Sequence, residues 1–288
     1  MKNTRRNVLK KMLAGTALFS AIPFIEIKAK NNMSLKGNIN HSVCQWTFGH
    51  LSLEELCITI KELGFNAIDL VGPNGWDTLK KHDVQSSMCN GAEINLIHGF
   101  NHKEYHKKLV DNYTEMIPMV AKAGYKNLIC FSGNKEGMDD ETGLKNSEEG
   151  LKKILSLAEK HGVVLQMELL NSKVDHPDYM ADNSKWGVEL CKRLDSDNFK
   201  LLYDIYHMQI DEGDVIRTIK QNHQYYGHYH TAGNPGRNEI NHTQELNYPA
   251  IMKAIVETGY SGYVAQEFIP KASDKVASLR EAIDICDV

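Results

Sequence analysis

Four acidic or imidazole side chains in the second half of the chain each end a short apolar run. Asp and Glu are rarely buried without a partner, so four such residues in similar positions suggest a shared role. Three carboxylates and one imidazole suit Mn²⁺, Mg²⁺, Co²⁺ or Zn²⁺, and a cation offsets their mutual repulsion. A salt bridge or cap at each position is the alternative. We predict one divalent metal ion, held by Glu168, Asp204, His230 and Glu267.

Further polar and aromatic residues could bind a substrate next to these ligands. His207 lies in a predicted loop after one of them and could hold a substrate oxygen or polarise a carbonyl. Arg237 lies on a glycine-rich loop, from which its planar fork could bind an oxyanion. A solvent-exposed position is the alternative for both. We therefore predict that both residues bind substrate.

Strand-end residues in the first half of the chain are expected to wall the pocket. A sugar ring stacks well on an indole face, although a Trp at such a position is also explained by ordinary packing. We expect two of these residues, Trp46 and His98, to select the substrate. The others are Asp69 and Trp76.

Short β-rich runs alternate with longer amphipathic segments from residue 40 onward, which is the pattern of βα units around a parallel sheet. The repeated order of helix, glycine and strand favours a single-domain (β/α)8 TIM barrel over residues 38–288. A doubly wound open sheet is the alternative. No Gly-x-Gly-x-x-Gly follows the first strand, so we predict no nucleotide cofactor. The eight predicted strands cover residues 39–46, 67–71, 93–98, 127–131, 163–168, 199–204, 225–230 and 262–267. Since active residues of such barrels lie at the C-terminal ends of the strands, closure would bring the four ligands to one mouth.

Two long runs resemble the hydroxypyruvate isomerase family within the xylose-isomerase-like barrels. They are Tyr-Asp-Ile-Tyr-His-Met-Gln at residues 203–209 and Gly-His-Tyr-His-Thr-Ala-Gly-Asn-Pro-Gly-Arg at residues 227–237. The resemblance covers the second half of the mature chain well and the first half only by its rhythm of strands and helices. It implies a metal-dependent isomerase in which the four predicted ligands bind the metal and the two glutamates, Glu168 and Glu267, are catalytic because they move the proton.

The chemistry implied by this resemblance is proton transfer through an enediolate in a small sugar or hydroxy-keto substrate. Return of the proton to the adjacent carbon gives aldose-ketose isomerisation, and return to the opposite face gives epimerisation. Loss of a β-substituent gives elimination, which would open 3-keto-glycosides. A metal-dependent phosphodiesterase and a non-catalytic sugar-binding protein of the cell envelope are alternatives from other classes.

The chain departs from the isomerase pattern at several positions. The related isomerases usually have Gln where His230 stands and Asp where Gly233 stands, and His at the first position is similar to the ketose 3-epimerases. The basic residue that often follows the last Glu is missing after Glu267. The motif expected after the third strand is not visible in residues 95–100. The metal chemistry is compatible with these differences, whereas the substrate stays open among ketoses, 3-keto-glycosides and hydroxypyruvate.

The N-terminus has the layout of an export leader. A basic start with the pair Arg5 and Arg6 precedes an uncharged apolar stretch of residues 12–25, which is too short for a membrane-spanning helix. We predict a twin-arginine-like signal peptide over residues 1–30, export to the periplasm and no stable membrane span after its removal. An ordinary basic leader and a retained anchor are the alternatives.

Charge and cysteine content limit the partners. Residues 1–30 carry seven Lys or Arg and one Glu, whereas the remainder has a net charge of −10. An acidic body argues against nucleic acid, so a small carbohydrate is the expected partner. Related barrels often pair, which makes a homodimer one option. The six cysteines lack Cys-x-x-Cys spacing and are expected to be buried free thiols, with one disulfide as the alternative.

Overall fold

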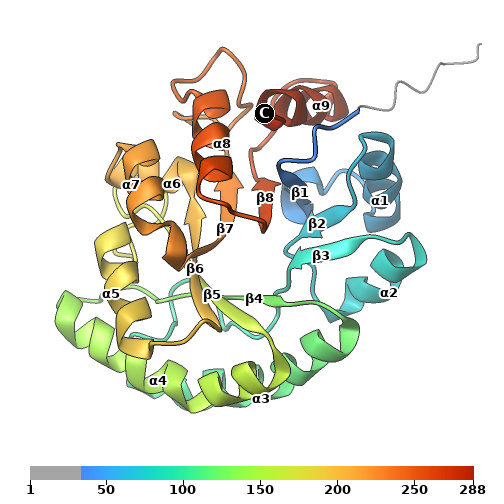
Figure 1. Cartoon of the computed structure of the whole chain (residues 1–288). Helices are drawn as coiled ribbons and strands as arrows, with labels where there is room; N and C mark the ends of the chain where they lie inside the picture. The colour runs from blue at the N-terminus through green and yellow to red at the C-terminus, as the bar shows by residue number, and fades with distance from the viewer. Residues whose placement is uncertain (1–33) are drawn as a thin grey trace, which may run out of the picture. The chain divides into compact units, whose positions relative to one another are not determined.

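Eight short parallel strands form a ring with the helices outside it in residues 34–288, the part of the chain that the computed structural model describes (Figure 1). Most strand residues are buried, which agrees with their apolar sequences and with helices covering a parallel sheet. The strands are β1 (Asn40–Cys44), β2 (Ala67–Asp69), β3 (Gln85–Met88), β4 (Asn127–Cys130), β5 (Val164–Leu169), β6 (Phe199–Asp204), β7 (Tyr226–Thr231) and β8 (Tyr263–Gln266).

The sheet closes on itself. Its order is β3, β2, β1, β8, β7, β6, β5, β4, with every neighbouring pair parallel. The two ends meet where Cys89, just after β3, forms a parallel bridge with Leu128 of β4. The Cys89 amide donates to the Asn127 carbonyl at 2.9 Å, and its carbonyl accepts from Ile129 at 3.0 Å. The predicted (β/α)8 TIM barrel is therefore confirmed, and the open sheet is wrong.

The helices begin and end where the sequence places capping residues. Ser52 and Glu55 form a capping box at the start of the first helix. Gly124 and Gly162 end two later helices at φ of +90° and +66°, values that favour glycine. The helices are α1 (Leu53–Glu62), α2 (Pro73–Lys81), α3 (Lys103–Ala123), α4 (Asp140–His161), α5 (Ser184–Leu194), α6 (Ile205–Asp211), α7 (Val215–Asn222), α8 (Tyr248–Glu257) and α9 (Lys275–Cys286), with short 3-10 helices η1 (Gln45–Phe48) and η2 (His223–Tyr225).

The barrel interior is polar at one level. His228 and His230 lie two residues apart on β7, so both point to the same face of the sheet. Both imidazoles contact Asp69 of β2, which is not a neighbour of β7 in the sheet. A contact between strands that are not neighbours must cross the interior, so these residues lie inside the ring.

The third strand was predicted wrongly. Residues 93–98 include the apolar residues Ile94, Leu96 and Ile97, yet they form an irregular loop between β3 and α3. The observed third strand is Gln85-Ser86-Ser87-Met88. Its sequence is mostly polar, so it lacks the apolar run by which the other strands were predicted. The reason is that Ser87 points to a buried carboxylate instead of an apolar core. The other seven predicted strands overlap the observed ones.

Further predictions concern the cysteines, membrane-spanning helices and the N-terminal leader. All six cysteines are buried and free, as expected. Among residues 34–288, none of the helices combines the length and the apolar character that crossing a membrane requires. The predicted signal peptide lies outside the described residues.

Candidate active site

The four predicted ligands converge at one end of the barrel. Glu168 lies in β5, Asp204 ends β6, His230 lies in β7 and Glu267 directly follows β8. One ligand atom from each lies within 4.8 Å of those of the other three, and all four residues are buried. The structure thus brings together the side chains that strand-end positions predict.

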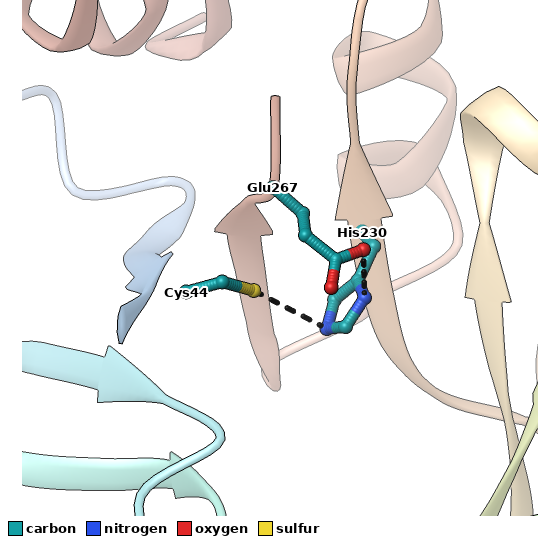
Figure 2. A group of neighbouring side chains, drawn as sticks. All are labelled: Cys44, His230 and Glu267. Atoms are coloured by element: carbon teal, nitrogen blue, oxygen red, sulfur yellow. Dashed lines mark hydrogen bonds and ion pairs between the residues drawn. The ribbon is translucent and has the colours of Figure 1, made fainter. Parts of the chain in front are cut away.

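His230 stands at the centre of this group. Its Nδ1 lies 3.2 Å from Glu168 Oε1 and 2.9 Å from Glu267 Oε2. Its Nε2 lies on the other side of the ring, 3.0 Å from Asp69 Oδ1 and 3.9 Å from the Cys44 sulfur. Figure 2 shows the two ring nitrogens in contact with different neighbours, one with Glu267 and the other with Cys44. One nitrogen is therefore directed at the predicted metal position and the other at the residues beneath it.

Burial separates the acidities of the carboxyl groups. Burial raises the pKa of Glu168 above its ordinary value and raises that of Asp204 to about 8. Burial acts the same way on Glu267, but the charges of His230 and Arg237 overcome it and hold the pKa of Glu267 well below its usual range. Burial also opposes a charge on His230, yet the carboxylate of Glu267 keeps the pKa of its imidazole well above normal. When all three carboxyl groups are ionised, they carry more negative charge than His230 and Arg237 neutralise, and a bound cation would offset this excess.

Arg237 reaches the site from the loop after β7, as predicted. Its Nη2 donates to Glu267 Oε2 at 2.6 Å and lies 3.6 Å from Asp204 Oδ2. The guanidinium stands 5.3 Å from the ring centre of Trp46 and 5.7 Å from that of Tyr206. Its Nε is buried and has no hydrogen-bond partner among the described residues. The alternative of a surface arginine is wrong.

Trp46 also contacts the ligand group. It lies in η1, directly after β1, and its indole Nε1 donates to Glu267 Oε1 at 2.8 Å. The side chain is nevertheless 47% exposed, so it lies at the opening of the site. Its position agrees with the predicted role in substrate contact, which itself stays a prediction.

His207 is buried in α6 with a defined tautomer. The carbonyl oxygen of the Asn171 side chain accepts backbone bonds from Val174 and Asp175 at 3.0 and 2.9 Å, which fixes the orientation of that amide. Its nitrogen therefore donates to His207 Nδ1, so the proton of the neutral ring lies on Nε2. Burial and the charge of Arg237 hold the pKa of His207 well below normal, which keeps the ring neutral.

The Nε2 of His207 has no hydrogen-bond partner among the described residues and lies 3.6 Å from Asp204 Oδ2. A buried N–H donor beside a predicted ligand is suited to a substrate oxygen. The predicted loop position was wrong, because this residue belongs to a helix, and so was the alternative of solvent exposure.

The other three residues expected to wall the pocket are bonded to or packed against other parts of the chain, and their roles in substrate contact stay predictions. His98 is half-buried on the loop before α3, where it stacks on Tyr105 at 4.5 Å and bonds Asn95 at 3.2 Å. Trp76 is buried, and its indole donates to the Val71 carbonyl at 2.9 Å, which is ordinary packing. Asp69 is fully buried beneath His230. Sequence reasoning also missed Asn171, whose only signal was its place three residues after Glu168.

Comparisons with known proteins agree with this architecture. A family model described as xylose isomerase-like TIM barrel matches residues 59–286. The chain is 35% identical over 124 residues to a 2-oxo-tetronate isomerase of Cupriavidus necator, covering 43% of this chain and 47% of that protein. It is 30% identical over 171 residues to hydroxypyruvate isomerase of Escherichia coli, covering 59% and 65%. The matched segments thus span less than two thirds of either relative.

A solved structure, 3-keto-D-glucoside 4-epimerase of Escherichia coli, superposes with a TM-score of 0.73 at 20% identity, covering 85% of this chain and 98% of that one. At this identity the likeness concerns the fold. The family model, by contrast, spans most of the sequence and ends close to its last residue. The chain therefore belongs to the xylose isomerase-like TIM barrel family, as its resemblance predicted.

Proposed function

We propose that the protein is a divalent-metal-dependent isomerase that moves a proton next to a carbonyl of a small sugar or hydroxy-keto substrate. The observation that carries the proposal is the approach of two buried glutamates, Glu168 and Glu267, to one nitrogen of His230 at 3.2 and 2.9 Å. The isomerase names of two curated relatives support the reaction class.

The donor set fits a divalent ion. Glu168, Asp204, His230 and Glu267 would hold it, since their ligand atoms are already gathered and three of the four are carboxylates. When bound, the ion supplies positive charge next to a substrate carbonyl and so lowers the cost of the negative charge that develops there.

The two glutamates are held differently, which suggests different tasks. Glu267 is fixed by Trp46 on one oxygen and by Arg237 and His230 on the other. In the described chain the Glu168 carboxylate contacts His230 alone. Burial raises the pKa of Glu168, which brings it closer to that of a general base working near neutral pH. We therefore assign removal of the substrate proton to Glu168, with Glu267 as the second proton carrier.

His207 and Arg237 are the proposed substrate-binding residues. Each presents a buried N–H without a partner among the described residues, on His207 Nε2 and on Arg237 Nε. Buried donors left unpaired are costly, so a ligand oxygen is their natural partner. Trp46 offers a half-exposed indole at the same opening, where a sugar carbon face can pack.

Epimerisation is the second candidate, favoured by the imidazole at position 230 and by glutamates that come from β5 and from the end of β8. Two carboxylates on different sides of a carbon can remove and return a proton on opposite faces. A phosphodiesterase is less well supported, because that hypothesis expects His ligands on early strands. In residues 34–288 the histidines of the candidate metal groups, His228 and His230, both come from β7.

The test is product analysis with a matched inactive variant. Protein stripped with a chelator and reloaded with Mn²⁺ is incubated with hydroxypyruvate, 2-oxo-tetronate, ketoses and 3-keto-glycosides, and the products are identified by NMR. We expect interconversion of one of these classes by the wild type and none by Glu168→Gln. A metal-loaded protein that converts none of them contradicts the proposal and favours the binding-only alternative.

A further inference from the structure

Asp69 is a fully buried carboxylate shared by two imidazoles and a hydroxyl group. Its Oδ1 lies 3.0 Å from His230 Nε2, and its Oδ2 accepts from the Ser87 hydroxyl at 2.6 Å. His228 Nε2 lies 2.8 Å from the same Oδ2. Ser42 extends the network, since its hydroxyl lies 2.6 Å from that of Ser87. Side chains from β3 and β7 thus surround one carboxylate of β2 inside the barrel, and Ser42 of β1 supports Ser87.

This placement bears on which nitrogen of His230 keeps a proton. Glu168 and Glu267 both face Nδ1, so these two carboxylates favour a proton there. A protonated Nδ1 has no lone pair for a cation. Asp69 is the carboxylate on the opposite side, and its bond to Nε2–H favours the tautomer that leaves Nδ1 free. When a cation displaces the proton at Nδ1, Asp69 therefore favours the proton that remains at Nε2.

The Asp69 cluster is suited to orienting His230 and not to holding an ion of its own. Both Asp69 oxygens already have polar neighbours, at 3.0 and 2.6 Å. The nearest sulfur, on Cys44, lies 3.6 Å from Asp69 Oδ1, and burial raises the pKa of that thiol well above normal. Figure 2 shows the Cys44 sulfur directed at Nε2 of the ring, while the Glu267 carboxylate faces the other ring nitrogen. The sulfur and a Glu267 oxygen nevertheless lie within 4.8 Å of each other.

We propose that Asp69 is a positioning residue that fixes the Nε2–H tautomer of His230 and so prepares Nδ1 to bind the metal ion, with Ser87 and His228 holding Asp69 in place. The inference rests on the metal centre of the proposed function but not on its reaction. A hydrogen bond from the remote nitrogen of a ligating imidazole typically changes metal affinity by about 10- to 100-fold.

The test uses the full chain loaded with Co²⁺ and compares three variants. Asp69→Asn keeps the shape of the side chain and removes its charge. Ser87→Ala removes one bond to Asp69. Ser86→Ala is the matched control, since Ser86 is the adjacent buried serine of β3 and bonds the carbonyls of Val71 and Met88 instead.

Two readouts are made, the Co²⁺ dissociation constant by calorimetry and the paramagnetically shifted N–H resonance of His230 by proton NMR. His230 is the one imidazole of the four-ligand group, so one exchangeable resonance is expected from it. We expect Asp69→Asn to weaken Co²⁺ binding at least about tenfold and to shift this resonance and speed its exchange with solvent. Ser87→Ala should change both readouts in the same direction by less, and Ser86→Ala should change neither.

An Asp69→Asn protein with wild-type affinity and an unshifted resonance overturns the inference. A merely structural role lowers the melting temperature of this variant but leaves the resonance of its folded fraction in place, which also counts against the proposal. If Asp69→Asn lowers its own yield of folded protein, Ser87→Ala decides by the same two readouts. Neither readout depends on turnover. A protein that isomerises no substrate but shows these shifts would therefore contradict the proposed reaction and still support the positioning role of Asp69.

Discussion

Arg237 Nη2 lies 2.6 Å from Glu267 Oε2, so a buried guanidinium is bonded to one of the four predicted metal ligands. The same nitrogen lies 3.6 Å from Asp204, a second predicted ligand. Arg237 therefore supplies part of the positive charge that the carboxylate cluster requires. It links the proposed substrate-binding loop after β7 directly to the ligand group.

Replacement of Arg237 by Met should destabilise the metal-free protein and enlarge its response to metal. Removing one partner of a buried ion pair costs about 3–5 kcal/mol, which corresponds to a melting temperature lower by on the order of 10 °C. Added Mn²⁺ should raise the melting temperature of the variant more than that of the wild type. Thermal melting with and without Mn²⁺ measures both effects.

Arg193→Met is the control for this experiment. Arg193 pairs with Glu141 at 2.7 Å on the surface, where solvent screens the two charges and such a bond contributes little to stability. If Arg237→Met melts within about 2 °C of this control, the ion pair in the site has no role in stability.

Replacement of Glu168 by Gln should remove turnover while keeping the fold. The amide cannot accept the substrate proton, so kcat should fall by at least about 100-fold. The circular dichroism spectrum and melting curve of the variant should stay close to those of the wild type, because Gln has nearly the same shape. If the variant turns over substrate at a near-wild-type rate, the assignment of Glu168 as the base is wrong.

His207→Ala should weaken catalysis without weakening metal binding. The lost bond from Nε2–H to a substrate oxygen corresponds to about 10- to 100-fold in kcat/KM. Asn171→Ala should act in the same direction by less, since it frees the tautomer but keeps the ring. Steady-state kinetics and calorimetry with Mn²⁺ separate the two effects. Equal losses of metal affinity and kcat/KM in His207→Ala would show that this residue supports the metal site instead.

The metal-free protein should lose stability as the pH rises from about 6.5 to about 8, a range in which the lowered pKa of His207 no longer has the opposite effect. Burial raises the pKa of Asp204 from 3.8 to about 8, so the folded state holds a proton that the unfolded state has released over this range. The raised pKa of Glu168 and of His230 acts in the same direction. A cation favours the ionised carboxylates, so saturating Mn²⁺ should flatten this decline and bind more tightly at pH 8 than at pH 6. Melting curves across this pH range decide, and a metal-free protein that gains stability toward pH 8 contradicts the prediction.

The leader prediction is independent of the barrel. Changing Arg5 and Arg6 together to Lys should block export through a twin-arginine route and leave the protein in the cytoplasm. Cell fractionation and immunoblotting measure the distribution. Unchanged export of the double variant favours the ordinary basic leader.

Much of the site could be predicted because its ligands break a strong local rule. Glu168, Asp204 and Glu267 are acidic residues at the ends of buried strands, which few other roles explain. The fold followed from the same alternation of apolar strands and amphipathic helices. β3 was not predicted because Ser86 and Ser87 give it no apolar pattern. Ser87 of this strand donates one of the hydrogen bonds that hold Asp69.

The part that could not be predicted depends on contacts across the barrel. Asp69 on β2 meets His230 on β7, strands that are far apart in the sequence and not neighbours in the sheet. Nothing in the local sequence distinguishes a carboxylate that walls a pocket from one beneath it. The predicted strand end at His98 was wrong because residues 93–98 form a loop, whereas the role of His98 in substrate selection stays a prediction.

The most direct test of metal-dependent proton transfer is deuterium uptake from D₂O, followed by NMR, into hydroxypyruvate, 2-oxo-tetronate, ketoses and 3-keto-glycosides. Chelator-treated protein, the same protein reloaded with Mn²⁺ and Mn²⁺-loaded Glu168→Gln are compared. We predict that the Mn²⁺-reloaded wild type exchanges deuterium into a carbon next to the carbonyl of one substrate class. The chelator-treated protein and Glu168→Gln should show no exchange. Exchange that is independent of metal, or absent from every substrate although the metal is bound, contradicts the proposed function.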